Sequence, residues 1–276
     1  MKAESPFDCL KPEAIAALAE DITYGKATKP AAKTFQLAIF AGAFIAIAFI
    51  FYITVVSQGG SKLAGGLCFS LGLILCVILG GELFTSSTLT LVAKAAKRIT
   101  WTQMLRNWAL VYSGNLVGGL IMVTLIVLSS QYTAGDGQWG LAALNTAQHK
   151  LHHTFIEAVA LGTMCNIMVC LAVWMAFGGR TMTDKALIMV LPVGMFVASG
   201  FEHSIANMFM IPVGIAIHAL AGPEFWTAIG ADPAKYADLT VSHFIFKNLI
   251  PVTIGNIIGG GVMIGLTNWF IFRRHH

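Results

Sequence analysis

Charge is what this sequence has least of. Only 11% of its 276 residues are Asp, Glu, Lys or Arg, whereas 57% are hydrophobic, and the mean hydropathy is +0.76. Soluble domains carry roughly 25% charged residues, so the composition excludes an ordinary soluble protein and predicts a membrane protein. A net charge of +4 would hint only weakly at nucleic acid or anionic lipid, and no nucleic-acid partner is expected.

Signatures of covalent or metal chemistry are also scarce. The five cysteines form no CxxC pattern, and Cys68, Cys76, Cys165 and Cys170 lie in apolar runs as small packing residues, so no disulfide is implied. The run HKLHH (149–153) has no Cys or acid at ligand spacing, and we interpret it as an interfacial basic cap. No metal and no cofactor are expected. The first 30 residues lack the apolar core of a signal peptide.

Long apolar runs are abundant instead. About 20 helical residues cross roughly 30 Å of hydrocarbon, and four runs are long enough: 35–56, 108–128, 155–177 and 249–272. Two more are interrupted. The run 67–79 meets GGELFTSS (80–87) before continuing to Val92, and 186–198 meets SGFEHSIAN (199–207) before continuing to about His218. We predict six transmembrane helices, two of them broken.

The few basic residues give the orientation, because Lys and Arg near span ends favour the cytoplasm. With six spans and a cytoplasmic N-terminus, four basic residues lie outside and 13 inside. The outside set is Lys62, Lys150, Lys235 and Lys247; the inside set is Lys2, Lys11, Lys26, Lys29, Lys33, Lys94, Lys97, Arg98, Arg106, Arg180, Lys185, Arg273 and Arg274. Both termini are therefore predicted to be cytoplasmic in a multi-pass membrane protein.

The chain also repeats itself. At an offset of 120 residues, Phe35 pairs with Phe155, Gly42 with Gly162, Gly80 with Gly200 and Glu82 with Glu202; at 141, the segment 106–122 matches 247–263 at seven of 17 positions. The second offset exceeds the first by 21 residues, and these additional residues fit in the loop 222–242. Two repeats of three spans each, 35–128 and 155–272, enter the membrane from opposite sides. We predict a channel domain over 35–276, preceded by a cytoplasmic segment 1–34.

The two breaks are the predicted centre of the protein. Each lies about 13 residues into its span, near the midplane at 1.5 Å per residue, and the helix after each break points its positive N-terminal end inward. A small anion should be favoured there. Glu82 and Glu202 are expected to cap unpaired backbone N–H groups, and Asn115 and Asn256 to hydrogen-bond across helices.

One residue at the breaks is not explained by the repeat. His203 pairs with Leu83 in the first half, so the break itself does not require an imidazole. An ionisable group inside a membrane is a functional candidate. At the N-terminus, residues 12–24 place Ile15, Leu18 and Ile22 at helical spacing. This amphipathic helix is expected to lie on the membrane or to cover a pore mouth.

Four motifs carry a resemblance to a known family. GGELFTSS, HKLHHTFIEA, GFEHSIANMFMIP and NLIPVTIGNIIGGG strongly resemble the formate channels of the bacterial formate/nitrite transporter family, and the resemblance covers essentially the whole chain. It implies an aquaporin-like protomer within a homopentamer, each protomer with its own pore for formate. The resemblance also implies a set of pathway residues: His203, Thr85, Lys150, Asn166, Glu202 and Asn207 as polar positions, and Phe69, Leu73, Leu83 and Phe196 as apolar constrictions.

A bare anion loses several kcal/mol of hydration in an apolar constriction. We therefore expect protonated His203 to give formate a proton in transit, and the N-terminal helix to close the cytoplasmic mouth at acid pH. A proton-coupled transporter of nitrite, hydrosulfide or another short carboxylate remains the alternative. A hydrolase built on Ser204 and His203 is disfavoured, since adjacent residues rarely face each other and no GxSxG turn is present. His275 and His276 are native residues or a tag remnant.

Overall fold

The computed structural model describes residues 10–274, and every regular element in that range is a helix. The elements are α1 (Pro12–Thr28), α2 (Ala31–Ser57), α3 (Lys62–Leu79), α4 (Phe84–Ser87), α5 (Thr90–Ala95), α6 (Trp101–Leu128), η1 (Gln131–Thr133), α7 (Gln138–Leu151), α8 (Phe155–Gly178), α9 (Met182–Ala198), α10 (Ser204–Leu220), α11 (Pro223–Ile229), η2 (Pro233–Tyr236), α12 (Val241–His243), η3 (Phe244–Leu249), α13 (Ile250–Asn256), η4 (Ile257–Leu266) and α14 (Thr267–Phe272). The last five form one continuous helix in which η3 and η4 are π-helical.

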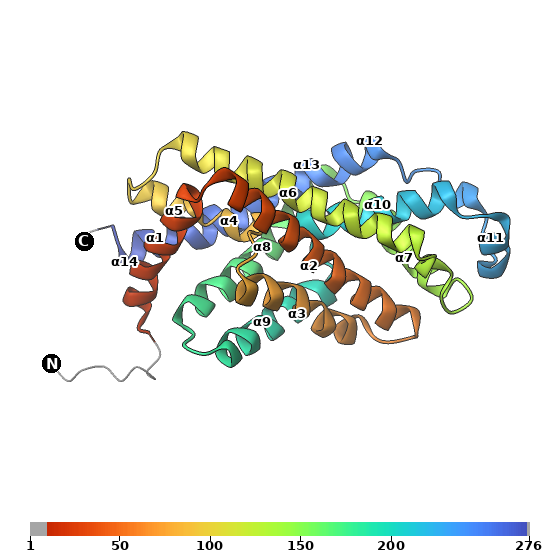
Figure 1. Cartoon of the computed structure of the whole chain (residues 1–276), viewed down its shortest axis with the longest axis horizontal. Coiled ribbons are helices and arrows are strands. Elements are labelled where there is room, and N and C mark those ends of the chain that lie inside the picture. The colour runs from red at the N-terminus through yellow and green to blue at the C-terminus, as the bar shows by residue number, and fades with distance from the viewer. Residues whose placement is uncertain (1–9, 275–276) are drawn as a thin grey trace.

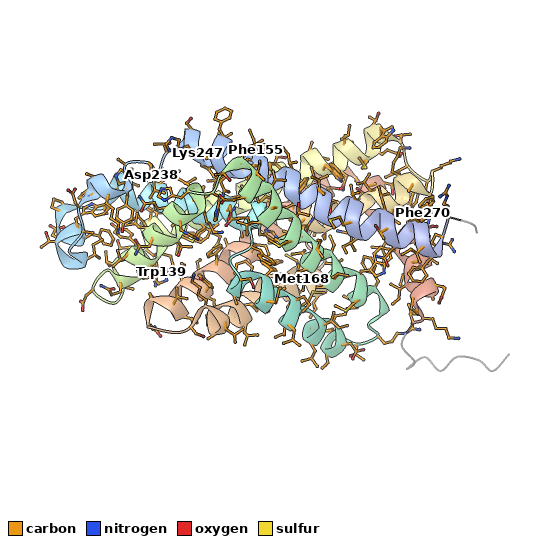
Figure 2. All side chains as sticks on the ribbon, turned by 180° about the vertical axis from the view of Figure 1, so that it is seen from behind. Trp139, Phe155, Met168, Asp238, Lys247 and Phe270 are labelled. Atoms are coloured by element: carbon orange, nitrogen blue, oxygen red, sulfur yellow. The ribbon has the colours of Figure 1, made fainter. Side chains whose placement is uncertain are left out.

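Most long helices run roughly along the long axis of the molecule (Figure 1). Helices α1 and α14, nearest the two chain termini, lie at one end, and α7 and α11 lie at the other. Figure 2, from behind, shows the same polarity, with Phe270 near one end and Asp238 near the other. We refer to the α1 end and the α7 end below.

Five helical stretches are long and apolar enough to cross a membrane: α2, α3, α6, α8 and the stretch Pro233–Phe272. A sixth results if α10 and α11, which are bent by 113°, count as one span. Large apolar side chains project outward from these helices and their neighbours; Leu128 is 76% exposed and Ile156 is 79% exposed. Such surfaces suit contact with lipid or with other subunits, and the fold is an all-α membrane protein. The count of six spans stays a prediction.

Both predicted helix breaks are present. One separates α3 from α4 and the other separates α9 from α10. Gly80 and Gly200 turn the chain at the start of each break, and both have φ of +75°. That left-handed conformation is readily adopted by glycine and costs other residues energy. The two breaks therefore share one backbone solution.

The helices before the breaks are longer than predicted. α3 has 18 residues and α9 has 17, against a predicted 13, because hydropathy missed polar first turns that contain Lys62 and Lys185. The first break lines a cavity at the α1 end and the second lines one at the α7 end. The depth of the breaks in the membrane stays a prediction, but the two breaks meet at the centre, where His203 Nε2 lies 3.1 Å from Thr85 Oγ1.

The repeat has a different register in its first helix. The Leu37 carbonyl accepts the Glu82 N–H at 3.1 Å, and the Leu161 carbonyl accepts the Glu202 N–H at 3.3 Å. The two glutamates are 120 residues apart, but the two leucines are 124 apart. The second copy thus has four residues fewer between α8 and its break than the first copy has between α2 and its break.

The predicted pairing of Phe35 with Phe155, and of Gly42 with Gly162, is therefore wrong by four residues. The two helices start 124 residues apart, α8 has 24 residues against 27 in α2, and the connection 179–181 is one residue shorter than 58–61, so the four residues are missing at the end of α8 and just after it. An apolar pattern cannot reveal such a deletion, whereas the hydrogen bonds do.

The offset of 141 between α6 and the last helix is confirmed by their packing. A Cβ on Gly118 would lie 2.1 Å from the Ile39 carbonyl oxygen, and one on Gly259 would lie 2.1 Å from the Thr163 carbonyl oxygen. Only glycine permits these backbone contacts, which let α6 touch α2 and η4 touch α8. Ile39 and Thr163 are again 124 residues apart.

Candidate functional site

Two cavities approach the centre of the fold from opposite ends. The α7-end cavity has a volume of about 220 Å³ and is bounded by Lys62, Lys150 and His203 among others. The α1-end cavity has a volume of about 500 Å³ and is bounded by Lys26 and Lys29 among others. No residue borders both cavities. Together they outline a passage that is interrupted in the middle.

The four predicted constriction residues surround that interruption. Phe69 and Phe196 border the α7-end cavity, while Leu73 and Leu83 border the α1-end cavity. Phe69 and Leu73 are neighbours on successive turns of α3. The Phe69 and Phe196 rings meet edge to face, with centroids 6.1 Å apart. All four side chains are at most 3% exposed, so the barrier between the cavities is apolar.

His203 borders the α7-end cavity beside this barrier. Its Nε2 lies 3.1 Å from Thr85 Oγ1, and its Nδ1 accepts the backbone N–H of Ala206 at 3.1 Å. Because Nδ1 accepts, the neutral ring has its hydrogen on Nε2 and donates it to the threonine. The ring also stacks on Phe196, with centroids 5.9 Å apart. The predicted pair of His203 and Thr85 is thus brought together from α10 and α4.

Asn166 forms a hydrogen bond to the backbone of Thr85. Its Nδ2 donates to the Thr85 carbonyl at 3.1 Å and to the Asn256 carbonyl at 2.5 Å. The Cys170 thiol also approaches the Thr85 carbonyl, at 3.4 Å. Asn166 borders neither cavity, so this predicted pathway residue positions Thr85 and does not face the passage.

Glu202, Lys150 and Asn207 form one buried network behind the α7-end cavity. Lys150 Nζ lies 2.9 Å from Glu202 Oε1, and Asn207 Nδ2 donates to Glu202 Oε2 at 2.6 Å. Asn248, which sequence reasoning did not select, donates to the same Oε2 at 3.1 Å and to the Lys150 carbonyl at 2.9 Å. A buried carboxylate requires such partners.

Glu82 has an equivalent network at the α1 end. Lys26 Nζ lies 2.7 Å from Glu82 Oε2, and Lys29 forms an ion pair with Oε1. Asn107 Nδ2 donates to the Lys26 carbonyl at 3.0 Å. Sequence reasoning assigned both lysines only to the cytoplasmic side. The sequence feature that could have identified Lys26 is its position 124 residues before Lys150. A comparison at the offset of 120 residues does not align these two lysines.

The expectation that the two glutamates cap the helix starts is wrong, and asparagines take that role. Asn115 Oδ1 accepts the Phe84 N–H at 2.9 Å, and Asn256 Oδ1 accepts the Ser204 N–H at 3.0 Å. Each asparagine also bridges to α2 or α8 and to the carbonyl of the break glutamate. Their predicted cross-helix bonds are confirmed. The Phe84, Ser204 and Ala206 N–H groups already donate within the protein, so these three groups are not free to bind an anion directly.

Among the described residues, Ser204 and His203 do not form a nucleophile–base pair. The buried Ser204 hydroxyl has no hydrogen-bond partner within residues 10–274, and the adjacent His203 turns both nitrogens elsewhere. No group of three or more His, Cys, Asp or Glu side chains in the described residues could bind a metal ion. What remains is a passage with a charged lining at each mouth.

These features define a helical membrane protein of the channel or transporter class. The model of the formate/nitrite transporter family matches residues 13–270, and the chain belongs to that family. The formate channel FocA of Escherichia coli (strain K12) is 61% identical over 100% of both chains, and FocB of the same strain is 45% identical over 99% of both. A solved structure described as a pentameric formate channel with formate bound has a TM-score of 0.84 at 55% identity, covering 88% of this chain and 97% of that chain.

Proposed function

We propose that this protein is a channel for formate and related small monovalent anions across the bacterial inner membrane. The path runs from the α7-end cavity, past His203 and the four constriction residues, into the α1-end cavity. The family membership and the formate channels among the relatives support the substrate class. The single observation on which the path depends is the pair of cavities that end on either side of one apolar barrier.

Formate crosses that barrier as formic acid. An anion is stabilised in the lysine-containing mouths by Lys150 or by Lys26 and Lys29. Within the apolar ring, burial disfavours the charged form of a carboxylate and therefore favours its protonation. A neutral molecule then avoids the several kcal/mol that a dehydrated ion would cost.

His203 is the nearest group able to supply the proton. In the neutral ring, the single hydrogen lies on Nε2 toward Thr85, and Nδ1 accepts from Ala206. An imidazolium has a hydrogen on both nitrogens, so charging His203 must break the Ala206 bond. Proton delivery is therefore coupled to movement of this ring, and the proton returns when formate leaves.

The test is formate flux in proteoliposomes carrying His203→Phe, which retains a ring against Phe196 but removes both nitrogens. We expect flux to fall at least tenfold, at the low end of what a positioned acid–base group contributes, and its pH dependence to flatten. An unchanged rate with an unchanged pH response would remove the proton step. The matched control is His152→Gln, since His152 borders neither cavity at the barrier.

The same liposomes separate the channel from the alternative, a proton-coupled transporter of nitrite, hydrosulfide or another short carboxylate. A coupled transporter moves anion uphill when a proton gradient is imposed, and a passive channel only equilibrates it. Competition of formate with nitrite, acetate, lactate and hydrosulfide ranks the substrates. Chemical turnover without a membrane would indicate an enzyme.

The α1 end is the cytoplasmic side in this proposal, because 13 of the 17 Lys and Arg residues are assigned there when six spans are counted. Both termini are then cytoplasmic. The protein acts as a homopentamer in the lipid bilayer, as supported by the solved pentameric relative and by the exposed apolar helix faces.

Helix α1 closes the cytoplasmic mouth at acid pH in this proposal. Leu18 and Ile22 of α1 border the α1-end cavity, and Glu20 pairs with Arg273 at 3.0 Å. Deleting residues 1–28 is a poor test, because it also removes Lys26 from Glu82. Glu20→Gln removes the α1–Arg273 ion pair and leaves an amide oxygen that can still accept from Trp269 Nε1, and we expect acid inhibition of flux to begin at a higher pH. An unaltered inhibition curve would refute the gate.

A further inference from the structure

Two histidines beside the α7-end cavity take no part in the mechanism above: His149 lines it, whereas His153 lines a separate pocket with Lys247 and reaches the cavity only through Glu202. His149 borders the cavity, and its ring meets that of His153 edge to face, with centroids 5.2 Å apart. His153 Nε2 is buried and has no hydrogen-bond partner within residues 10–274. It lies 3.8 Å from Glu202 Oε1, the oxygen that already pairs with Lys150.

The repeat gives His153 a counterpart. At the offset of 124 residues, Lys150 corresponds to Lys26 and His153 corresponds to Lys29. Lys26 and Lys29 both pair with Glu82. The α1 end therefore balances one buried carboxylate with two permanent cations. The α7 end balances its carboxylate with one permanent cation and one imidazole, a group that is a cation only when it is protonated.

The surroundings of His153 determine when this charge is present. The titratable and charged groups around it come from α7 and the turn after it, from α8, from η3 and from the second break: His149, Lys150, His152, Glu157, Lys247 and Glu202. Burial holds the pKa of His149 below its ordinary value, and repulsion from His153 and Lys150 adds to that effect. Protonation of His149 is therefore disfavoured.

The α1-end cavity has no equivalent group. The ionisable side chains that border it, among the residues the structure describes, are Lys26, Lys29, Lys185, Cys76 and Glu82. No histidine is among them. The charge of the α1-end cavity therefore does not depend on the protonation of a histidine.

We propose that His153 is a proton-operated switch of the α7-end cavity: when protonated, it pairs with Glu202 beside Lys150 and gives that cavity the excess positive charge that Lys29 gives the α1 end permanently. Acid outside the cell then concentrates anions at the outer mouth only. The switch rests on the proposed function, since it acts on the anion that enters there.

Initial rates of labelled formate uptake in right-side-out membrane vesicles test this switch. KM is measured at an outer pH of 7.5 and of 5.5, with the inner pH fixed. One added charge a few ångström from the anion lowers KM by about three- to tenfold in a partly hydrated mouth. The accompanying change in the formic acid fraction is the same for every variant, so it cancels when variants are compared.

We expect His153→Gln to lose this three- to tenfold component of the KM shift. His153→Lys, which copies the α1 end, should keep a low KM at both outer pH values. His152→Gln is the matched control, because its side chain points to Asp238 and it should follow the wild type. A wild-type KM ratio in both His153 variants overturns the switch while leaving the channel intact. Absence of formate flux in the wild type overturns the channel and the switch together.

Discussion

The two helix breaks are one backbone arrangement used twice with different side chains. Both begin at a left-handed glycine, both have their first free N–H capped by an asparagine of a distant helix, and both bury a glutamate against a lysine from the preceding extramembrane helix. The shared residues are those that a broken helix needs, because unpaired backbone groups and unpaired carboxylates are costly in a membrane.

The unmatched positions show where the two halves diverge. His203 stands where the first half has Leu83, and Thr85 stands where the second half has Ile205. These two polar exceptions contact each other at 3.1 Å across the centre. Repetition thus accounts for the architecture, and we propose that its failure at these two positions, among others, marks the transport chemistry.

The largest expected effect follows from breaking the shared part. Asn115→Leu leaves the Phe84 N–H and the Ala38 and Glu82 carbonyls without their partner. Each unsatisfied buried group costs about 1–3 kcal/mol, so we expect little folded protein. Asn256→Leu should be equally damaging, because its bonds are equivalent. Size-exclusion profiles and melting temperatures in detergent measure this.

Ser113→Ala is the control for the asparagine variants, since this hydroxyl is exposed and bonds only within its own helix. If Asn256→Leu folded normally while Asn115→Leu did not, the two breaks would not be energetically equivalent.

The lysines allow a graded comparison of the two ends. Lys150→Met removes the closest cation from Glu202, and breaking a buried pair costs about 3–5 kcal/mol. Lys26→Met should cost less, because Lys29 remains paired with Glu82. The double change Lys26→Met with Lys29→Met should approach the cost of Lys150→Met. Melting temperatures at neutral pH test the ranking.

Glu202→Gln added to Lys150→Met is the matched control for that ranking, because it removes the uncompensated charge and should restore much of the lost stability. Equal losses for Lys26→Met and Lys150→Met would contradict the role of Lys29 as a second cation.

The unmatched pair predicts a smaller and purely functional effect. Thr85→Val keeps the shape of the side chain but removes the hydroxyl that accepts from His203. We expect formate flux to fall by about tenfold, the equivalent of one lost hydrogen bond of roughly 1.4 kcal/mol, without loss of folded protein. Ile205→Val, at the corresponding position, is the control. Equal flux in the two variants would remove Thr85 from the path.

Sequence reasoning found what the apolar runs and the repeat display directly. The breaks, the exceptional His203 and the linking asparagines follow from a few rare residues in an apolar chain. The partners of those residues were harder to predict. Glu82 and Glu202 had two chemically reasonable acceptor roles, and choosing between backbone N–H groups and lysines requires knowing which groups approach them.

The charges of α1 were missed for a different reason. Lys26 of α1 and Lys29, which follows that helix, lie outside the predicted repeat, and the four residues missing between the end of α8 and α9 hide their alignment with Lys150 and His153. Sequence identity at a fixed offset is therefore a poor guide to register between repeated helices, and packed glycines and hydrogen bonds give a better one.

The smallest expected effect concerns how α7 is anchored. Asp238 accepts from Gln148 at 2.8 Å and pairs with His152 at 2.7 Å. Burial tends to raise the pKa of this carboxyl, but the hydrogen bonds from Gln148 and His152 outweigh it, so the pKa lies below the ordinary 3.8.

A lowered folded-state pKa stabilises the protein above about pH 4, and the stabilisation is lost as pH falls through the lower folded value. Asp238→Asn should therefore cost about 0.2–1 kcal/mol at pH 7, as for an exposed ion pair, and the difference from wild type should shrink below pH 3.8 and vanish once the pH is below the lowered folded-state pKa. Melting temperatures from pH 7 to pH 3 measure it, with Glu224→Gln as the exposed control; a difference that persisted in acid would show that α7 depends on the shape of Asp238 and not on its charge.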